Sequence, residues 1–105
     1  MTAMPVSLLE WKKVEKNTLR GFAKVRMGKA LIVRDVSVHA SHGKRWASLP
    51  SKPVLLADGT QKKDANTGKA VYVPILEWAD RDTADSFSEG VIQAVEAQHP
   101  GDTGA

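Results

Sequence analysis

Four evenly spaced side chains carry the clearest chemistry in this sequence of 105 residues. They occupy alternate positions of the segment 19–27: Arg20, Phe22, Lys24 and Arg26. A β-strand would place them on one face, because strand side chains alternate between faces. Lysine and arginine bind phosphates, and an exposed ring stacks on an unpaired base. The pattern therefore suits either a nucleic-acid-binding surface or an ordinary solvent-facing strand whose ring packs under a neighbour.

A second basic segment, GKRWASLPSKP at 43–53, combines cations with a tryptophan and two prolines. Arg45 and Trp46 are adjacent, so a strand would point them to opposite faces. We expect Trp46 to lie largely in the core, and the prolines to restrict the backbone of the following corner. The segment then divides into surface cations, Lys44, Arg45 and Lys52, and structural residues, Trp46, Pro50 and Ser51.

Asp35 is a polar exception in the apolar segment 30–40. An unbroken strand would place it on the same face as Leu31 and Val33. A carboxylate on a buried face needs hydrogen bonds, because burying it unpaired is very costly. We expect the backbone amides of residues 50–52 to supply them, which would give Asp35 a structural role.

Histidine and acidic side chains do not suggest catalysis. His39 and His42 are three residues apart, but a metal site needs three or four ligands, and only His99 remains in a chain without cysteine. Asp35, Ser37 and His39 cannot form a triad, because alternate residues of one strand project in parallel. The sequence contains no glycine-rich phosphate loop or nucleophile motif. We expect no enzymatic activity, no metal and no cofactor.

Charge is unevenly distributed along the chain. Residues 1–79 contain 14 lysines and arginines against 6 acids, whereas residues 80–105 contain Arg81 against 6 acids. The two segments therefore carry +8 and −5, within an overall charge of +3. Such asymmetry predicts a basic surface on one part of the fold, which would attract polyanions.

The elements that must position these residues follow from hydrophobic periodicity. An α+β fold is expected, with one antiparallel sheet of about five strands and one C-terminal helix. Asp80 or Asp82 can cap this helix, and its stripe would cover one sheet face only. The strands are expected at 6–14, 19–27, 30–40, 44–49 and 70–75, and the helical stripe at Ala84, Phe87, Val91, Ala94, Val95 and Gln98.

The remaining segments define the domain organisation. One domain is expected over residues 1–98, with a disordered tail over 99–105. The polar segment 57–69 is predicted to be a mobile loop or a long hairpin tip. The N-terminus has no leader pattern, the chain has no long apolar run, and cysteine is absent. We therefore expect a cytoplasmic protein with no membrane partner.

Five short motifs follow one another along the chain: Asp-Val-Ser-Val at 35–38, an aromatic-led strand at Trp46, Leu-Pro-Ser-Lys at 49–52, Asp-Gly at 58–59 and Pro-Ile at 74–75. Their order resembles the SpoVG family of small bacterial proteins, named for a septation and sporulation phenotype. The resemblance covers most of residues 6–97. It implies a small fold of strands and a helix, usually dimeric, that binds DNA or RNA and regulates gene expression without catalysing a reaction.

Two features depart from the family pattern. The stretch between Asp-Gly and Pro-Ile is longer here and contains Lys62, Lys63 and Lys69, and the C-terminal helix is acidic. A binding role for that helix therefore does not carry over. Two alternatives remain: a protein-interaction module with separate partners for its basic face and acidic helix, and a transcription-coactivator-like domain that binds single-stranded DNA.

Overall fold

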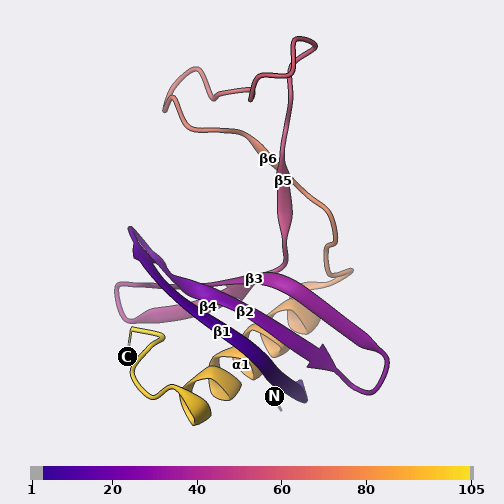
Figure 1. Ribbon diagram of the computed structural model, residues 1–105, viewed down its shortest axis with the longest axis vertical. Coiled ribbons are helices and arrows are strands. Elements are labelled where there is room, and N and C mark those ends of the chain that lie inside the picture. Colours follow the sequence, from indigo (N-terminus) through magenta and orange to yellow (C-terminus); the bar gives the residue numbers. More distant parts are fainter. Residues whose placement is uncertain (1–3, 105) are drawn as a thin grey trace.

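The body of the protein is a four-stranded antiparallel sheet with one helix packed on it, as Figure 1 shows for a computed structural model that describes residues 4–104. The strands follow one another in chain order across the sheet. Their bounds are β1, Val6–Lys16; β2, Leu19–Met27; β3, Leu31–Ser41; and β4, Lys44–Ser48. Short turns join them, so each strand pairs with its neighbour in sequence.

The helix α1, Arg81–Gln98, covers one face of the sheet. The Asp80 side chain accepts a hydrogen bond of 2.7 Å from the Thr83 amide, which satisfies a free N–H group at the helix start. Phe87, Val91 and Val95 are fully buried, which confirms most of the expected stripe, whereas Gln98 is exposed. The helix buries these side chains against the sheet and leaves the opposite sheet face open.

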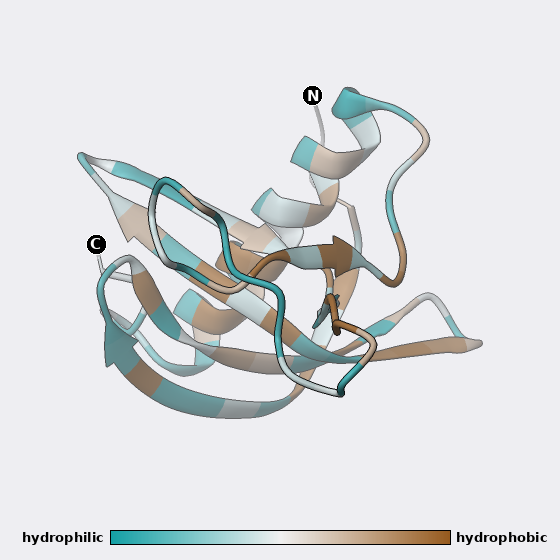
Figure 2. Ribbon diagram, turned by 90° about the horizontal axis from the view of Figure 1, so that it is seen from above, coloured by the Kyte–Doolittle hydropathy of each residue, from teal (hydrophilic) through white to brown (hydrophobic). Residues whose placement is uncertain are grey.

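Alternation along the strands determines which side chains enter the core. In β2, Gly21, Ala23 and Val25 are buried toward the helix. Figure 2 shows the resulting alternation of hydrophobic and hydrophilic residues along the ribbons. The core consists of Leu8, Ala23, Val25, Val33, Val36, Val38, Phe87, Val91, Ile92 and Val95.

Gly90 explains how the N-terminal segment reaches the helix. A Cβ atom at this position would collide with the backbone carbonyl oxygen of Met4. The Met4 amide donates a hydrogen bond of 3.0 Å to the carbonyl oxygen of Ser86, one turn earlier. Glycine therefore weakens the helix locally but allows this close backbone approach.

The expected fifth strand does not join the main sheet. Instead, β5, Ser51–Pro53, pairs with β6, Tyr72–Pro74, in a separate two-stranded ribbon. We call residues 51–76 the arm; Figure 1 shows it standing away from the sheet on the side opposite α1. Its polar tip is organised by turns, in which the Asp58 carboxylate accepts from the Thr60 amide at 3.0 Å and the Asp64 carboxylate accepts from the Asn66 amide at 2.7 Å.

Residues 99–104 are packed on the body, in contrast to the disordered tail expected over 99–105, of which residue 105 lies outside the described residues. Thr103 is fully buried, and the Trp11 indole N–H donates a hydrogen bond of 2.9 Å to the Asp102 carboxylate. These contacts join the segment to the sheet, which local sequence does not indicate. The fold is α+β, with an antiparallel sheet and a C-terminal helix as expected, but with four strands in the main sheet and two in the arm.

Candidate nucleic-acid interface

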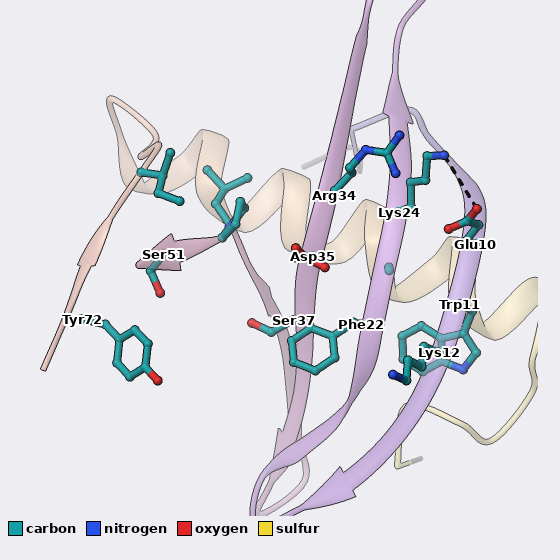
Figure 3. A pocket seen from close by; sticks show the side chains of 14 residues that line it. Glu10, Trp11, Lys12, Phe22, Lys24, Arg34, Asp35, Ser37, Ser51 and Tyr72 are labelled. Atoms are coloured by element: carbon teal, nitrogen blue, oxygen red, sulfur yellow. Dashed lines mark ion pairs between the residues drawn. The ribbon is translucent and has the colours of Figure 1, made fainter. Parts of the chain in front are cut away.

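A hollow of about 1140 Å³ lies between the open face of the sheet and the base of the arm. Figure 3 shows the Phe22 ring on the sheet side and the Tyr72 ring on the arm side, with the hydroxyl groups of Ser37 and Ser51 beside them. Phe22 is half-buried, and Tyr72 is 56% exposed. Two aromatic rings therefore face one hollow from separate parts of the fold.

Charged side chains line the sheet side of this hollow. Lys12, Lys24 and Arg34 contribute three cations, and Glu10 and Asp35 contribute two carboxylates. The Lys24 ammonium group pairs with the Glu10 carboxylate at 3.7 Å. Within residues 4–104, Lys12 and Arg34 take part in no ion pair. The net charge of the lining is +1, and two of its cations remain available to an anion.

Arg26 extends this positive surface beyond the hollow. It follows Phe22 and Lys24 at alternate positions of β2, and residues between them are buried toward the helix. Arg26 is exposed and pairs in register with Ile32 of β3. The structure therefore brings Phe22, Lys24 and Arg26 to one face, as their spacing predicts.

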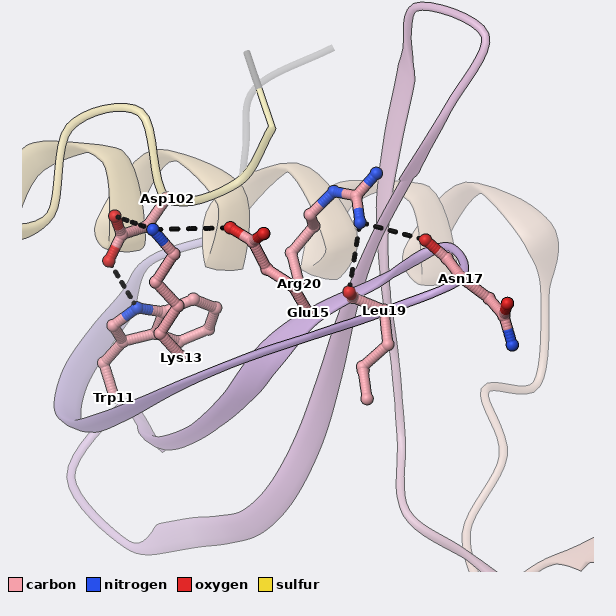
Figure 4. A network of polar contacts seen from close by, with 7 residues as sticks. All are labelled: Trp11, Lys13, Glu15, Asn17, Leu19, Arg20 and Asp102. Atoms are coloured by element: carbon pink, nitrogen blue, oxygen red, sulfur yellow. Dashed lines mark hydrogen bonds and ion pairs between the residues drawn. The ribbon is translucent and has the colours of Figure 1, made fainter.

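Arg20 does not join that face. Leu19 pairs with His39 and Gly21 with Val38, so Arg20 is an extra residue at a β-bulge. Its guanidinium group donates hydrogen bonds to the carbonyl oxygens of Asn17, at 3.0 Å, and Leu19, at 3.2 Å (Figure 4). The expectation of four aligned side chains is therefore wrong at Arg20, because the bulge interrupts the alternation.

Arg20 contributes to a second, smaller hollow of about 370 Å³ at the β3–β4 turn. Lys44 and Arg45 line it as well. The Arg45 guanidinium group donates to the Thr103 hydroxyl at 2.9 Å and pairs with the Glu96 carboxylate at 3.4 Å. The cations expected to bind therefore lie at separate places and do not form one continuous patch. Glu96 of the helix neutralises Arg45.

Glu96 is held ionised by its neighbours. The Thr103 hydroxyl donates a short hydrogen bond to its carboxylate, and the Gly101 amide donates another at 3.0 Å. These hydrogen bonds, with a smaller contribution from the Arg45 guanidinium, lower the pKa of Glu96 below its usual range. The cluster binds the C-terminal segment to β4 and leaves little of the Arg45 charge for a ligand.

Trp46 and Asp35 both differ from expectation. Trp46 stacks on His39, with ring centroids 5.4 Å apart and planes 9° apart, and is only half-buried. Because His39 lies between the helix-facing Val38 and Ala40, this stack lies on the open side of the sheet. The prediction of a core tryptophan is therefore wrong: the β4 side chain that packs against the core is the partly buried Ala47.

A bulge in β3 accounts for Asp35. Val33 pairs with Val25 and Val36 with Ala23, so two residues, Arg34 and Asp35, lie opposite one. Asp35 adopts a left-handed φ of 57° and is exposed at the hollow. It is not buried with Val33, and a hydrogen-bonded role in the core is therefore ruled out.

The residues of the corner at 50–52 do not all lie on the side of the arm that faces the hollow. Pro50 and Ser51 line the hollow. Ser51 pairs with Pro74 and Lys52 with Val73, so alternation points Lys52 away from the side that carries Ser51. Lys52 is exposed, but it does not contribute to the hollow.

Several residues of the hollow were not expected from the sequence to bind a ligand, among them Lys12, Arg34 and Tyr72. The alternation of β2 predicts an open face, but the residues opposite it depend on strand register and on two bulges. Tyr72 could have been noticed as the aromatic residue of an expected strand. Its position opposite Phe22 depends on where the arm stands.

Neither a group of metal ligands nor a membrane-crossing helix is found among the described residues. Among residues 4–104, no three histidine or acidic side chains lie close enough together to hold a metal ion. In the same part of the chain, no helix has the length and apolar character needed to cross a bilayer.

The comparisons with known proteins add no assignment. No protein family, curated protein or solved structure matches this chain. The open sheet face and its hollow are therefore the features from which a function can be argued.

Proposed function

We propose that this protein is a non-catalytic, cytoplasmic regulator that binds nucleic acid on the open face of its sheet. The observation that carries the proposal is the combination in one hollow of an accessible aromatic ring, Phe22, with two cations that have no carboxylate partner, Lys12 and Arg34. Such cations can bind the phosphates of a nucleic acid, and a base can stack on such a ring. The SpoVG-like order of motifs supports the same function.

Electrostatics set the expected affinity. Lys12, Lys24, Arg26 and Arg34 give four cations on this face, of which Lys24 is shared with Glu10. If all four contact a single strand, the logarithm of the binding constant falls with the logarithm of salt concentration at a slope of about −2.8. Burial and the nearby Arg20 lower the pKa of His39, so this ring adds no charge at neutral pH.

Fluorescence anisotropy with a labelled oligonucleotide over a series of salt concentrations tests the proposal. Lys12→Gln should weaken binding and make the slope shallower by about 0.7, because one phosphate contact is lost. Arg81→Gln is a matched control, since Arg81 is an exposed cation at the start of α1 on the other side of the sheet. Equal effects of the two substitutions, or a slope near zero for the native chain, would reject the proposed surface.

We further propose that a second copy of the chain covers part of the arm. Several large apolar side chains of the arm are exposed: Leu55 by 58%, Leu56 by 49%, Val73 by 37%, Ile75 by 59% and Leu76 by 45%. Clustered exposed apolar side chains are typical of protein contacts. The main sheet also exposes Leu9, Leu31 and Ile32, but the arm carries more of the exposed apolar side chains, which supports the arm as the dimer contact.

Sedimentation analysis tests this second proposal. Replacing Leu55 and Leu56 by serine should shift the protein from dimer to monomer at micromolar concentration without unfolding the body. These residues lie outside the core cluster. A native chain that sediments as a monomer at all concentrations would contradict the dimer while leaving nucleic-acid binding untouched.

A further inference from the structure

We infer that the hollow binds one unpaired base between Phe22 and Tyr72, so that the ligand is a single strand and not a duplex. This inference rests on the proposed function and specifies its ligand. Figure 3 shows the two rings on different sides of the hollow that both of them line, one on β2 and one on β6. Every base has faces that stack on aromatic rings, so such a pair is suited to bases of any sequence.

The surroundings of the rings fit a nucleotide. The Ser37 and Ser51 hydroxyl groups lie beside the rings and can hydrogen-bond the edge of a base (Figure 3). Lys12 and Arg34 lie on the same lining, where they can bind the phosphates on either side of that base. A neutral base and its charged backbone thus find matching chemistry in one hollow.

A paired base does not fit this arrangement. Its faces are covered by neighbouring bases in the duplex, so it would have to unstack before a ring could contact it. Unstacking costs a few kcal/mol, whereas an unpaired base can be extended and stacked without that cost. The position of both rings inside a hollow therefore favours single-stranded DNA or RNA.

The decisive experiment compares three ligands of equal length: a deoxythymidine oligonucleotide, a strand in which every nucleotide is abasic, and a duplex. Losing one base stack should weaken binding to the abasic strand by about 5- to 150-fold. The duplex should also bind more weakly than the thymidine strand. Equal affinity for the first two ligands, or tighter duplex binding, would overturn the base site.

Substitutions at Tyr72 separate stacking from charge. Tyr72→Leu should weaken binding of the thymidine strand but leave binding of the abasic strand unchanged, whereas Tyr72→Phe should retain the native affinity. Tyr72 is exposed and lies outside the core, so its loss should not unfold the protein. Leu31→Ala, an exposed apolar change at the start of β3 and outside the lining of the hollow, is the control and should have no effect.

A second readout reports stacking directly. A strand with one 2-aminopurine should lose fluorescence on binding to the native chain and regain it with Tyr72→Leu, because ring stacking quenches this base. Unchanged fluorescence on binding would overturn the base site but leave capture by cations intact. If neither the thymidine strand nor the abasic strand binds, the proposed function fails together with this inference.

Discussion

The two faces of the sheet differ in whether their cations form ion pairs with carboxylates. On the helix side, Arg45 pairs with Glu96, and Lys13 pairs with Asp102 at 3.6 Å. Figure 4 shows how Lys13 and the Trp11 indole meet the same Asp102 carboxylate. On the open side, Lys12 and Arg34 have no such partner within residues 4–104. The difference teaches that a count of cations does not locate a polyanion site.

The acidic C-terminal segment produces this difference. It follows the helix and so packs on the face that the helix covers, where its carboxylates meet the nearby cations. The resulting ion pairs and hydrogen bonds neutralise these cations and stabilise the fold. Among residues 4–104, the opposite face has the carboxylates of Glu10 and Asp35 at its hollow, and only Glu10 forms an ion pair there, with Lys24. We therefore expect helix-side substitutions to change stability and open-side substitutions to change binding.

The largest expected effect compares two phenylalanines on opposite faces. Phe87→Ala removes a fully buried ring from the core and should lower the free energy of unfolding by about 3–5 kcal/mol. Phe22→Ala should cost clearly less, because Phe22 is half-buried on the open face. Urea denaturation measures both. Equal losses would show that the open face is part of the core.

Thr103→Val should have the next largest effect on stability. The buried Thr103 hydroxyl donates to Glu96 and accepts from Arg45. Valine keeps the shape but removes both hydrogen bonds of the hydroxyl, so the free energy of unfolding should fall by about 1–3 kcal/mol. Thr103→Ser keeps the hydroxyl and should lose less. Oligonucleotide affinity should remain unchanged in both variants.

Two arginines provide the matched test of binding against stability. Arg34→Gln should make the dependence of the logarithm of the binding constant on the logarithm of salt concentration shallower by about 0.7. It should change the free energy of unfolding by less than about 0.5 kcal/mol, because Arg34 is an exposed side chain that forms no ion pair within residues 4–104. Arg45→Gln should lower stability and leave the slope unchanged. The proposed difference between the faces is wrong if Arg34→Gln lowers stability and Arg45→Gln weakens the salt dependence of binding.

Acid should weaken the helix side selectively. The Thr103 hydrogen bond is the main cause of the lowered pKa of Glu96 in the folded protein. The ionised carboxylate therefore stabilises the fold above the unfolded pKa of about 4.3. This stabilisation is lost as the pH falls through the folded pKa. Glu96→Gln should therefore flatten the fall in stability below about pH 4.3. Identical acid unfolding curves for the native and substituted chains would exclude this contribution.

Asp35→Asn should produce the smallest effect. Asparagine tolerates the left-handed φ of 57°, so stability should not change. Removing a carboxylate from the lining should strengthen oligonucleotide binding by up to about fivefold. Asp35→Glu serves as the control for charge, and its anisotropy titration should show no strengthening.

Local patterns in the sequence determined the elements of this fold. The alternation of β2 predicted one apolar face and one face with Phe22, Lys24 and Arg26, because side-chain direction in a strand has a period of two. The spacing of Phe87, Val91 and Val95 predicted the helix for a similar reason. Such periodicities act within a few residues, so they are visible without coordinates.

Only the tertiary structure decided which cations share a surface. Arg20 and Asp35 leave their expected faces because bulges arise from how neighbouring strands pair, and not from the strand itself. Arg45 and Glu96 are 51 residues apart in sequence. Their contact exists only after the helix has docked on the sheet, just as the hollow exists only because the arm stands over the open face. Charge and ring type were thus set by the sequence, whereas their grouping was set by long-range packing.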